Sequence, residues 1–460
     1  MTQSFGLTTT ARLALLQRLA KRRAHQDEAR AGQGHDGGGH AEGHGAGRQG
    51  RGHGTRSRFA DLPGMRDFAL MQTAVEALSL ESPFFRPHAG VAGARTTIGN
   101  GRYLNFSSYN YLGLNGDPRV TGAAKAAIDR YGVSPSASRL VSGERPVHAE
   151  LESLLAENYG AEAALCMVSG HATNVTVIGH LMGARDVIVH DAAIHNSCTE
   201  GARLSGARRI PFAHNDWRAA ERALEGARRA AGRALLVIEG HYSMDGDVPD
   251  LARFVEIARR HDAWLMVDEA HSLGVLGPTG RGIFEAQGVD PAGVDIWMGT
   301  LSKTLSGCGG FIAAQRDLIE WLRHTAPGFV YSVGLPPNLA AAASESLRIM
   351  RAEPWRVEKL QHNARHFRDR ARAMGFDTGS SEGHAIVPVI TGSSVKAARL
   401  SVAMFERGVN VQPIVFPAVP EQAARLRFFL CAEHETADLD RALEALADAM
   451  ASLSPLEVPG

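Results

Sequence analysis

The chain has 460 residues, 44% hydrophobic and 21% charged, which is enough for a large buried core with one or two smaller lobes. Its formal net charge is zero, so nothing in the charge favours nucleic acid or an acidic membrane as a partner. The four cysteines form no C-x-x-C pair, so we expect a cytoplasmic protein without a disulfide framework or a metal site. No apolar run reaches the ~18 residues that span a bilayer, so we expect no transmembrane segment.

Residues 1–62 predict a basic, flexible arm ahead of the folded chain. Residues 1–58 carry ten Lys and Arg against four Asp and Glu. Residues 11–24 place leucines on one helical face and basic residues near the end, a pattern typical of a docking helix, a transit peptide or a frayed helix. Residues 31–58 are rich in glycine and in irregularly spaced histidines, which favours a linker over a metal-binding tract.

Strand and helix patterns alternate in the rest of the chain. The hydrophobic spacing predicts helices over 67–80, 217–229, 251–261 and 337–352. Short apolar runs bounded by turn residues predict strands over 102–106, 163–168, 186–190, 208–212, 234–239, 263–268, 294–298, 309–314 and 386–390. This rhythm indicates an α/β protein with a mostly parallel sheet. We predict an N-terminal segment over 63–150, a large cofactor-binding domain over 151–336 and a small C-terminal domain over 337–460.

A candidate phosphate site follows the strand at 163–168. The sequence Ser-Gly-His-Ala-Thr-Asn at 169–174 opens a helix with small and polar residues. The first N–H groups of a helix are free to hold an anion. We therefore expect the backbone amides of Gly170 and His171 to bind a phosphate group.

Three later strands each end in polar residues. The first runs into Glu-Gly-His-Tyr-Ser at 239–243, the second into Asp268 and His271, and the third into Lys303. In open α/β sheets, ligands bind at this carboxyl edge. A desolvated lysine can form a Schiff base with a carbonyl, and pyridoxal phosphate (PLP) needs such a lysine together with an acid against its ring nitrogen. The residues alone thus predict a PLP-dependent lysine enzyme.

Three sequence stretches resemble one family in particular. EGHYSMDGD, VDEAHSLGVLGPTGRG and GTLSKTLSGCGGF occur in the order found in the α-oxoamine synthases, a branch of the fold-type-I PLP enzymes. The resemblance covers roughly residues 65–450. It implies a seven-stranded sheet with helices on both faces, a smaller α+β C-terminal domain, and a homodimer with shared active sites.

The resemblance also implies roles for individual side chains at the cofactor ring. Lys303 would bond to PLP and later act as the general base, while Asp268 would pair with the ring nitrogen. His195, in the pattern D-x-x-x-H-x-S, would stack on the ring. Ser243 and His271 would orient the phenolic oxygen.

Other matches imply contacts with phosphate and substrate. Thr300 would help to hold the phosphate, and Ser332, in a turn resembling the family's Y-S-T-S-x-P-P, would reach the cofactor of the partner subunit. The segment Ser-Tyr-Asn-Tyr-Leu-Gly, with Tyr109 and Tyr111, would line the substrate site. Arg427 would grip the amino-acid carboxylate through its planar guanidinium.

The implied reaction joins a small amino acid (serine, alanine or glycine) to an acyl thioester of coenzyme A or an acyl carrier protein. The products are an α-amino ketone, CO2 and a free thiol. The segment SYNYLG favours a serine palmitoyltransferase or a carrier-protein-linked synthase, with 8-amino-7-oxononanoate synthase as the alternative. A PLP aminotransferase or lyase is a further alternative, whereas a non-catalytic partner subunit would lack Lys303.

Overall fold

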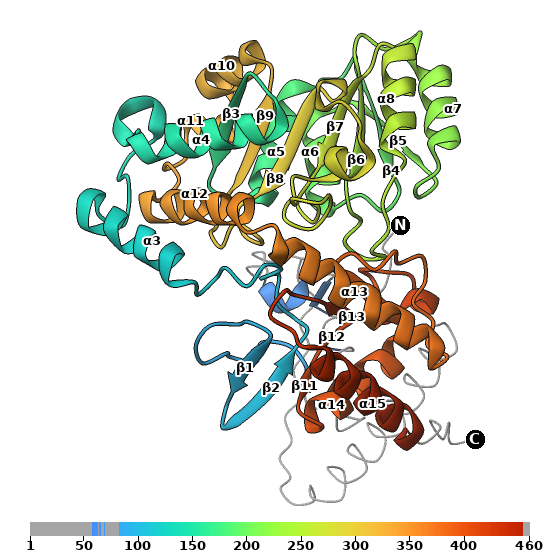
Figure 1. Ribbon diagram of the computed structural model, residues 1–460. Coiled ribbons are helices and arrows are strands. Elements are labelled where there is room, and N and C mark those ends of the chain that lie inside the picture. The colour runs from blue at the N-terminus through green and yellow to red at the C-terminus, as the bar shows by residue number, and fades with distance from the viewer. Residues whose placement is uncertain (1–57, 63, 66–68, 70–81, 454–460) are drawn as a thin grey trace, which may run out of the picture. The chain divides into compact units, whose positions relative to one another are not determined.

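The computed structural model describes residues 58–453 except 63, 66–68 and 70–81 (Figure 1). The predicted helix over 67–80 and nearly all of the predicted basic arm lie outside the described residues. Two compact units are present. The larger comprises Arg86–Ile390, Ala403–Gln412 and Leu426–Gly460, and the smaller includes Thr391–Val402 and Pro413–Arg425. None of the described helices is both long and apolar enough to cross a membrane.

A seven-stranded sheet forms the centre of the larger unit, in the order β3-β9-β8-β7-β6-β4-β5. Strands β4 to β8 run parallel, whereas β9 is antiparallel to both of its neighbours. The bounds are β3 (Ala163–Met167), β4 (Val187–Asp191), β5 (Arg208–Phe212), β6 (Ala234–Glu239), β7 (Trp264–Asp268), β8 (Ile296–Thr300) and β9 (Gly310–Ala314). Every residue of β4, β6, β8 and β9 is buried, as expected for a sheet covered on both faces. The structure confirms the predicted mostly parallel sheet.

Helices flank this sheet (Figure 1). Helix α5 packs on β8 and β9 and beside α6, α7 packs on β4, α8 on β7, and α10 on β3 and β9. The bounds are α3 (Pro118–Tyr131), α4 (Pro146–Tyr159), α5 (Gly170–Leu181), α6 (Asn196–Ser205), α7 (Trp217–Arg228), α8 (Leu251–Arg260), α9 (Ile283–Gln287), α10 (Arg316–Thr325), α11 (Pro327–Val330), α12 (Pro337–Ala352), α13 (Trp355–Ala373), α14 (Ser394–Glu406) and α15 (Thr436–Ser452). Several begin at side-chain caps: the carboxylates of Asp216 and Asp250 accept from the backbone N–H groups of Ala219 and Arg253.

Smaller sheets involve the two ends of the described chain. Strand β2 (Gly101–Asn105) pairs antiparallel with β1 (Arg95–Ile98) and parallel with β11 (Val409–Asn410). Strand β10 (Ile386–Ile390) lies beside β13 (Arg425–Phe429), and β12 (Gln412–Ile414) is a short strand between β11 and β13 in sequence. These strands, with α13 and α15, confirm the predicted smaller α+β part.

Within the smaller unit, a short segment folds back on the start of α14. Glu421 accepts hydrogen bonds from the backbone N–H of Ser394, at 2.9 Å, and from its hydroxyl. The Thr391 hydroxyl donates to the Ala424 carbonyl at 2.8 Å. The candidate active-site residues described below all belong to the larger unit.

Aromatic packing fixes the strand that leads to Lys303. The indole of Trp297 on β8 is 1% exposed, stacks on Tyr159 with a ring-centroid distance of 5.1 Å, and donates to the Pro291 carbonyl at 3.3 Å. The next residue but one, Gly299, has no room for a side chain, because a Cβ there would lie 2.4 Å from Phe311. Strand β8 is thereby held closely between its neighbours.

Candidate active site

Two carboxylates stand side by side at the carboxyl edge of the sheet. Glu239 ends β6, Asp268 ends β7, and the register places them opposite each other. Paired residues of neighbouring strands point to the same face of a sheet. Glu239 is 3% exposed and Asp268 4% exposed. The edge therefore carries two buried acids on one face.

Lys303 lies in a tight loop just after β8. The backbone closes on itself because Leu301 N–H donates to the Gly309 carbonyl at 2.9 Å and Ser306 N–H to the Lys303 carbonyl at 3.0 Å. Burial lowers the pKa of Lys303 to about 8, although the negative charges of Asp268 and Glu239 oppose this shift. An appreciable fraction of the amine is thus neutral, and hence nucleophilic, near neutral pH.

Asp268 is anchored through both carboxylate oxygens. One accepts from the Asn174 side-chain amide at 2.8 Å, and the other from the Ala270 backbone N–H at 2.9 Å. Asn174 lies in the first turns of α5 and was not predicted from the sequence. Its position four residues after Gly170, on one face of the predicted helix, was the available signal.

His195 caps α6 and is held in one tautomer. Its Nδ1 accepts from the Ser197 backbone N–H at 3.3 Å and lies 2.7 Å from the Ser197 hydroxyl, which itself accepts from the Asn174 amide at 3.0 Å. In the neutral ring the proton therefore lies on Nε2. Burial lowers the pKa of His195, with Asp268 opposing the shift, so the ring is neutral near physiological pH.

Glu239 is a second residue that the sequence analysis missed. One oxygen accepts from the His195 backbone N–H at 2.7 Å and the other from the Ser243 N–H at 3.2 Å. Burial and the neighbouring Asp268 carboxylate raise the pKa of Glu239 to about 8. A strand ending in Glu beside one ending in Asp was visible in the sequence, but its partners were not.

His271 meets two tyrosines. Its Nδ1 lies 2.7 Å from the Tyr111 hydroxyl, and the Tyr109 ring approaches it edge-on with a centroid distance of 5.9 Å. Burial and the positive charge of Lys303 lower the pKa of His271 well below its usual range. Nζ of Lys303 lies 5.5 Å from the centroid of the Tyr109 ring. The structure thus brings the predicted residues Tyr109, Tyr111, His271 and Lys303 together.

The start of α5 lies against the end of β8. A Cβ added to Gly170 would lie 2.9 Å from Oγ1 of Thr300, so only glycine fits there. The Ser169 side chain accepts from the Ala172 N–H at 3.3 Å, and its carbonyl accepts from the Thr173 N–H at 2.9 Å. As the first two amides of the helix, those of Gly170 and His171 remain for an anion. The N-terminus of α5 thus lies beside the Thr300 hydroxyl, and the binding of a phosphate there remains a prediction.

Comparison with known proteins decides the family. Residues 102–446 match the family model of aminotransferase class I and II. The 8-amino-7-oxononanoate synthase of Thermoanaerobacter pseudethanolicus is 40% identical over 366 residues, covering 80% of this chain and 90% of that protein. The corresponding enzyme of Methylobacterium nodulans is 42% identical over 362 residues, covering 79% and 91%.

Among solved structures, the serine palmitoyltransferase of Sphingomonas wittichii has 31% sequence identity and a TM-score of 0.81, covering 85% of this chain and 98% of that one. A serine palmitoyltransferase structure with PLP as internal aldimine has 30% identity and a TM-score of 0.80, covering 86% and 98%. This chain belongs to the aminotransferase class I and II family. Within it, the chain is a PLP-dependent acyltransferase of the α-oxoamine synthase branch, as the sequence motifs predicted.

The residues of this α-oxoamine synthase fit PLP. A lysine amine with a lowered pKa, a carboxylate fixed by two hydrogen bonds and a neutral imidazole converge at one sheet edge. The N-terminus of α5 adds backbone donors beside a threonine hydroxyl. These are the donor and charge types that an aldehyde, a pyridine nitrogen and a phosphate require.

Arg427 on β13 contacts the loop that follows β6. Its Nη1 donates to the Ser243 carbonyl at 2.9 Å and lies 3.2 Å from the Met244 sulfur, and its guanidinium carbon lies 4.6 Å from the centre of the Phe429 ring. Arg427 and Ser243 are therefore neighbours in this synthase.

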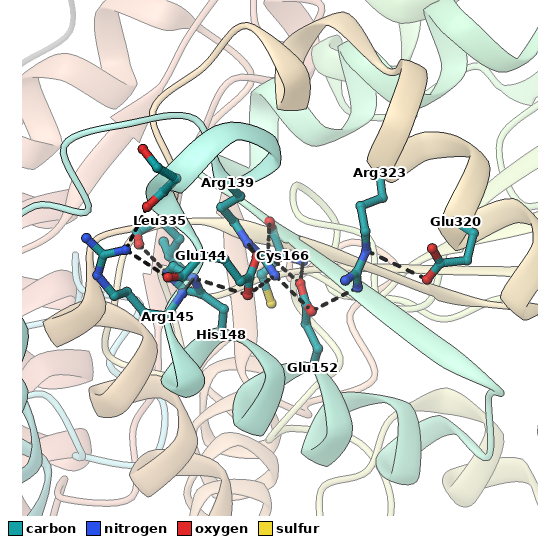
Figure 2. A network of polar contacts seen from close by, with 10 residues as sticks. Arg139, Glu144, Arg145, His148, Glu152, Cys166, Glu320, Arg323 and Leu335 are labelled. Atoms are coloured by element: carbon teal, nitrogen blue, oxygen red, sulfur yellow. Dashed lines mark hydrogen bonds and ion pairs between the residues drawn. The ribbon is translucent and has the colours of Figure 1, made fainter.

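Ser332 lies elsewhere, in a loop near a second set of charged side chains that is centred on Arg139. Its hydroxyl donates to the Val333 carbonyl at 3.2 Å, and the loop lines a small cavity of about 10 Å³ beside Arg139. Figure 2 shows Arg139 between Glu144 and Glu152, with hydrogen bonds of 2.7 and 2.5 Å. The structure places Ser332 in no hydrogen bond with the other predicted site residues among those described.

Proposed function

We propose that this enzyme condenses a small amino acid with an acyl thioester to give an α-amino ketone. A carbon–carbon bond forms between the amino-acid α-carbon and the acyl carbonyl, the thioester C–S bond breaks, and the carboxylate leaves as CO2. The observation that carries this proposal is the partly neutral amine of Lys303, with its lowered pKa, near the paired acids Glu239 and Asp268. The proposal is supported by the names of two relatives, 8-amino-7-oxononanoate synthase and serine palmitoyltransferase, since both are enzymes that condense an acyl group with an amino acid.

PLP, when bound, supplies an electron sink that stabilises negative charge on the amino-acid α-carbon. We propose that Lys303 bonds to the cofactor and then moves the α-proton as general base. Asp268, oriented by Asn174, supplies the negative charge opposite the ring nitrogen. The neutral His195 ring presents a flat face to stack on, and its fixed tautomer keeps Nε2–H as its outward donor.

The remaining predicted residues have positioning roles in this proposal. His271, hydrogen-bonded to Tyr111, and Ser243 orient the phenolic oxygen of the cofactor. Thr300 and the amides of Gly170 and His171 hold the phosphate. A further set is proposed to bind substrate or to complete a partner's site: Tyr109 and Arg427 for the amino acid, and Ser332 for the cofactor of a second subunit in a homodimer.

The identity of the amino acid follows from the products that the relatives' names describe. 8-Amino-7-oxononanoate carries a methyl group on its amino carbon, so that carbon and its methyl match alanine, whereas serine palmitoyltransferase names serine. We propose alanine and serine as the first two candidates and glycine as the third.

The test is the visible absorbance of the purified protein, supplied with PLP, while glycine, L-alanine and L-serine are added separately. We expect the amino acid that is the substrate to shift the cofactor band before any acyl thioester is added. Addition of the thioester should then produce the ketone and CO2. Absence of any cofactor band would contradict the proposal, and amino transfer to a keto acid without need for a thioester would favour an aminotransferase.

The acyl donor is proposed to be either an acyl-coenzyme A or an acyl carrier protein, the latter contacting the basic arm. Residues 1–58 carry the excess of positive charge that an acidic carrier protein would complement. Removal of residues 1–60 should raise the KM for a carrier-bound donor more than that for the coenzyme A donor. Unchanged kinetics with both donors would exclude this role of the arm.

A further inference from the structure

The carboxylate of Glu239 joins two segments that carry predicted cofactor contacts. His195 belongs to the loop between β4 and α6, and Ser243 to the loop after β6. Their backbone N–H groups donate to the two oxygens of the same carboxylate, at 2.7 and 3.2 Å. Glu239 itself is the last residue of a fully buried strand, so the anchor is attached to the rigid sheet.

The chain turns sharply just after this anchor. Gly240 donates its N–H to the Asp268 carbonyl at 2.9 Å, and a Cβ at Gly240 would lie 2.5 Å from both the Glu269 carboxylate and the Ser272 hydroxyl. A side chain at this position would therefore displace the Glu269 carboxylate and the Ser272 hydroxyl. The turn therefore brings Ser243 back to Glu239. The Arg427 guanidinium also donates a hydrogen bond to the Ser243 carbonyl at 2.9 Å.

Hydrogen bonds connect Glu239 to Asp268 around the His195 ring. From Glu239 they pass through the His195 backbone, and the His195 ring contacts the Ser197 hydroxyl at 2.7 Å. The Asn174 amide then donates both to that hydroxyl, at 3.0 Å, and to Asp268, at 2.8 Å. Glu239 thus fixes His195 through its backbone N–H. The network that ends on Asp268 fixes the His195 imidazole through Nδ1.

We propose that Glu239 is a positioning residue of the active site, which sets the His195 ring and the Ser243 hydroxyl in register with Asp268. This inference rests on the proposed function. A carboxylate suits the role because it accepts at both oxygens, whereas an amide of the same shape would turn an NH2 group toward one of the two N–H donors. Displacement of a positioning contact by about 1 Å can cost about a hundredfold in rate.

The test compares E239Q with the matched variant E269Q. Glu269 follows directly after β7 and is 0% exposed, and its carboxylate accepts from the Ile283 N–H at 3.3 Å rather than from His195 or Ser243. We expect both variants to lower the thermal midpoint. Only E239Q should raise the Kd for PLP about tenfold, change the circular dichroism of the bound cofactor, and lower kcat about a hundredfold.

A double variant asks whether Glu239 acts through His195. In the background H195A, the additional effect of E239Q on kcat should fall below about a hundredfold, because one of the two groups that Glu239 positions is gone while Ser243 remains. Multiplication of the two single effects would overturn the role through His195. E239Q with wild-type PLP affinity, dichroism and kcat would overturn the whole inference.

Two further outcomes are distinguishable. If E239Q does not accumulate as folded protein, E239D carries the same expectation, since it keeps the carboxyl group but withdraws it by one methylene. A wild-type protein that takes up no PLP would contradict the proposed function as well, whereas a normal wild type with a normal E239Q contradicts the positioning role alone.

Discussion

Two groups of charges in the same unit, each centred on a buried side chain, differ in how they are paired. Arg139, with 1% of its side chain exposed, meets Glu144 and Glu152 through paired hydrogen bonds of 2.5 to 3.1 Å, and Arg323 adds a contact of 3.3 Å to Glu152 (Figure 2). Within the part of the chain that the structure describes, Lys303 has no carboxylate within 4.0 Å, although two acids affect its pKa.

The pKa values reflect this difference. Although burial opposes it, the Arg139 guanidinium, which donates to Glu144 at 2.7 Å, lowers the pKa of Glu144 to about 2, so its charge is fixed at all ordinary pH. By contrast, the pKa of Lys303 is lowered to about 8 and the pKa of Glu239 is raised to about 8, so both values lie near neutral pH. In a paired cluster, removal of one partner leaves a buried charge uncompensated, whereas neighbouring groups with pKa values near neutral pH can exchange protons.

The sharpest test of this comparison is the removal of the lysine. Lys303→Ala should reduce product formation by at least about a thousandfold, because it removes the group that bonds the cofactor and moves the proton. Lys125→Ala, at an exposed position of α3, is the control and should keep the wild-type rate. Turnover by the Lys303→Ala protein at more than a tenth of the wild-type rate would exclude the predicted role.

The paired cluster should respond in stability. Arg139→Met leaves Glu152 buried without its main partner, which should lower the free energy of unfolding by about 3–5 kcal/mol. Denaturant titration measures this loss. Arg139→Lys keeps the charge but not the two-pronged geometry and should lose less. If Arg139→Met had normal stability but no activity, the two clusters would not differ in the way described.

A third cluster allows the comparison to be tested by pH. Nδ1 of His214 lies 2.9 Å from Asp191 and Nε2 lies 3.2 Å from Asp247. Although burial opposes it, the carboxylates of Asp191 and Asp247 raise the pKa of His214 to about 10. Because the folded pKa exceeds the usual 6.5, the stabilisation is complete below pH 6.5 and is lost as pH rises toward 10.

His214→Gln should therefore lower the free energy of unfolding by about 2 kcal/mol near neutral pH, and by progressively less at higher pH. The measurement is the difference in unfolding free energy between variant and wild type across this range, which cancels the titration of other groups. A difference independent of pH would mean that His214 is uncharged in the folded protein.

The smallest expected effect concerns a neutral hydrogen bond in the active site. Tyr111→Phe removes the 2.7 Å contact with His271 while keeping the ring. We expect a loss of about 1 kcal/mol in stability and less than a tenfold change in kcat. A loss of a thousandfold would instead assign the hydroxyl a direct part in proton transfer.

The sequence predicted the bounds of helices and strands well where these depend on the residues of the segment itself. Strands were expected over 208–212 and 234–239 and a helix over 337–352, and all three have these bounds. The strand before Lys303 was expected over 294–298 but spans Ile296–Thr300, because the glycine at 299 reads as a turn yet lies under Phe311. Close packing between strands distant in sequence is not visible in hydrophobic pattern.

The same limit applies to the site. Lys303, Asp268 and His195 were predicted because each stands in a short motif after a strand. Glu239 and Asn174 were missed because their roles depend on partners 44 and 94 residues away, at His195 and Asp268. The predicted domain bounds and the roles of the individual site residues remain predictions.

The packing of Trp297 gives the enzyme an optical reporter. Of its five tryptophans, this one is shielded from water, whereas Trp264, Trp321 and Trp355 are 36 to 50% exposed. Its emission should lie at shorter wavelength than theirs. The Cα atoms of Trp297 and Lys303 are at most about 22 Å apart, since six residues separate them. A chromophore attached to the lysine is therefore near enough to accept the excitation energy, and fluorescence quenching can follow its capture in real time.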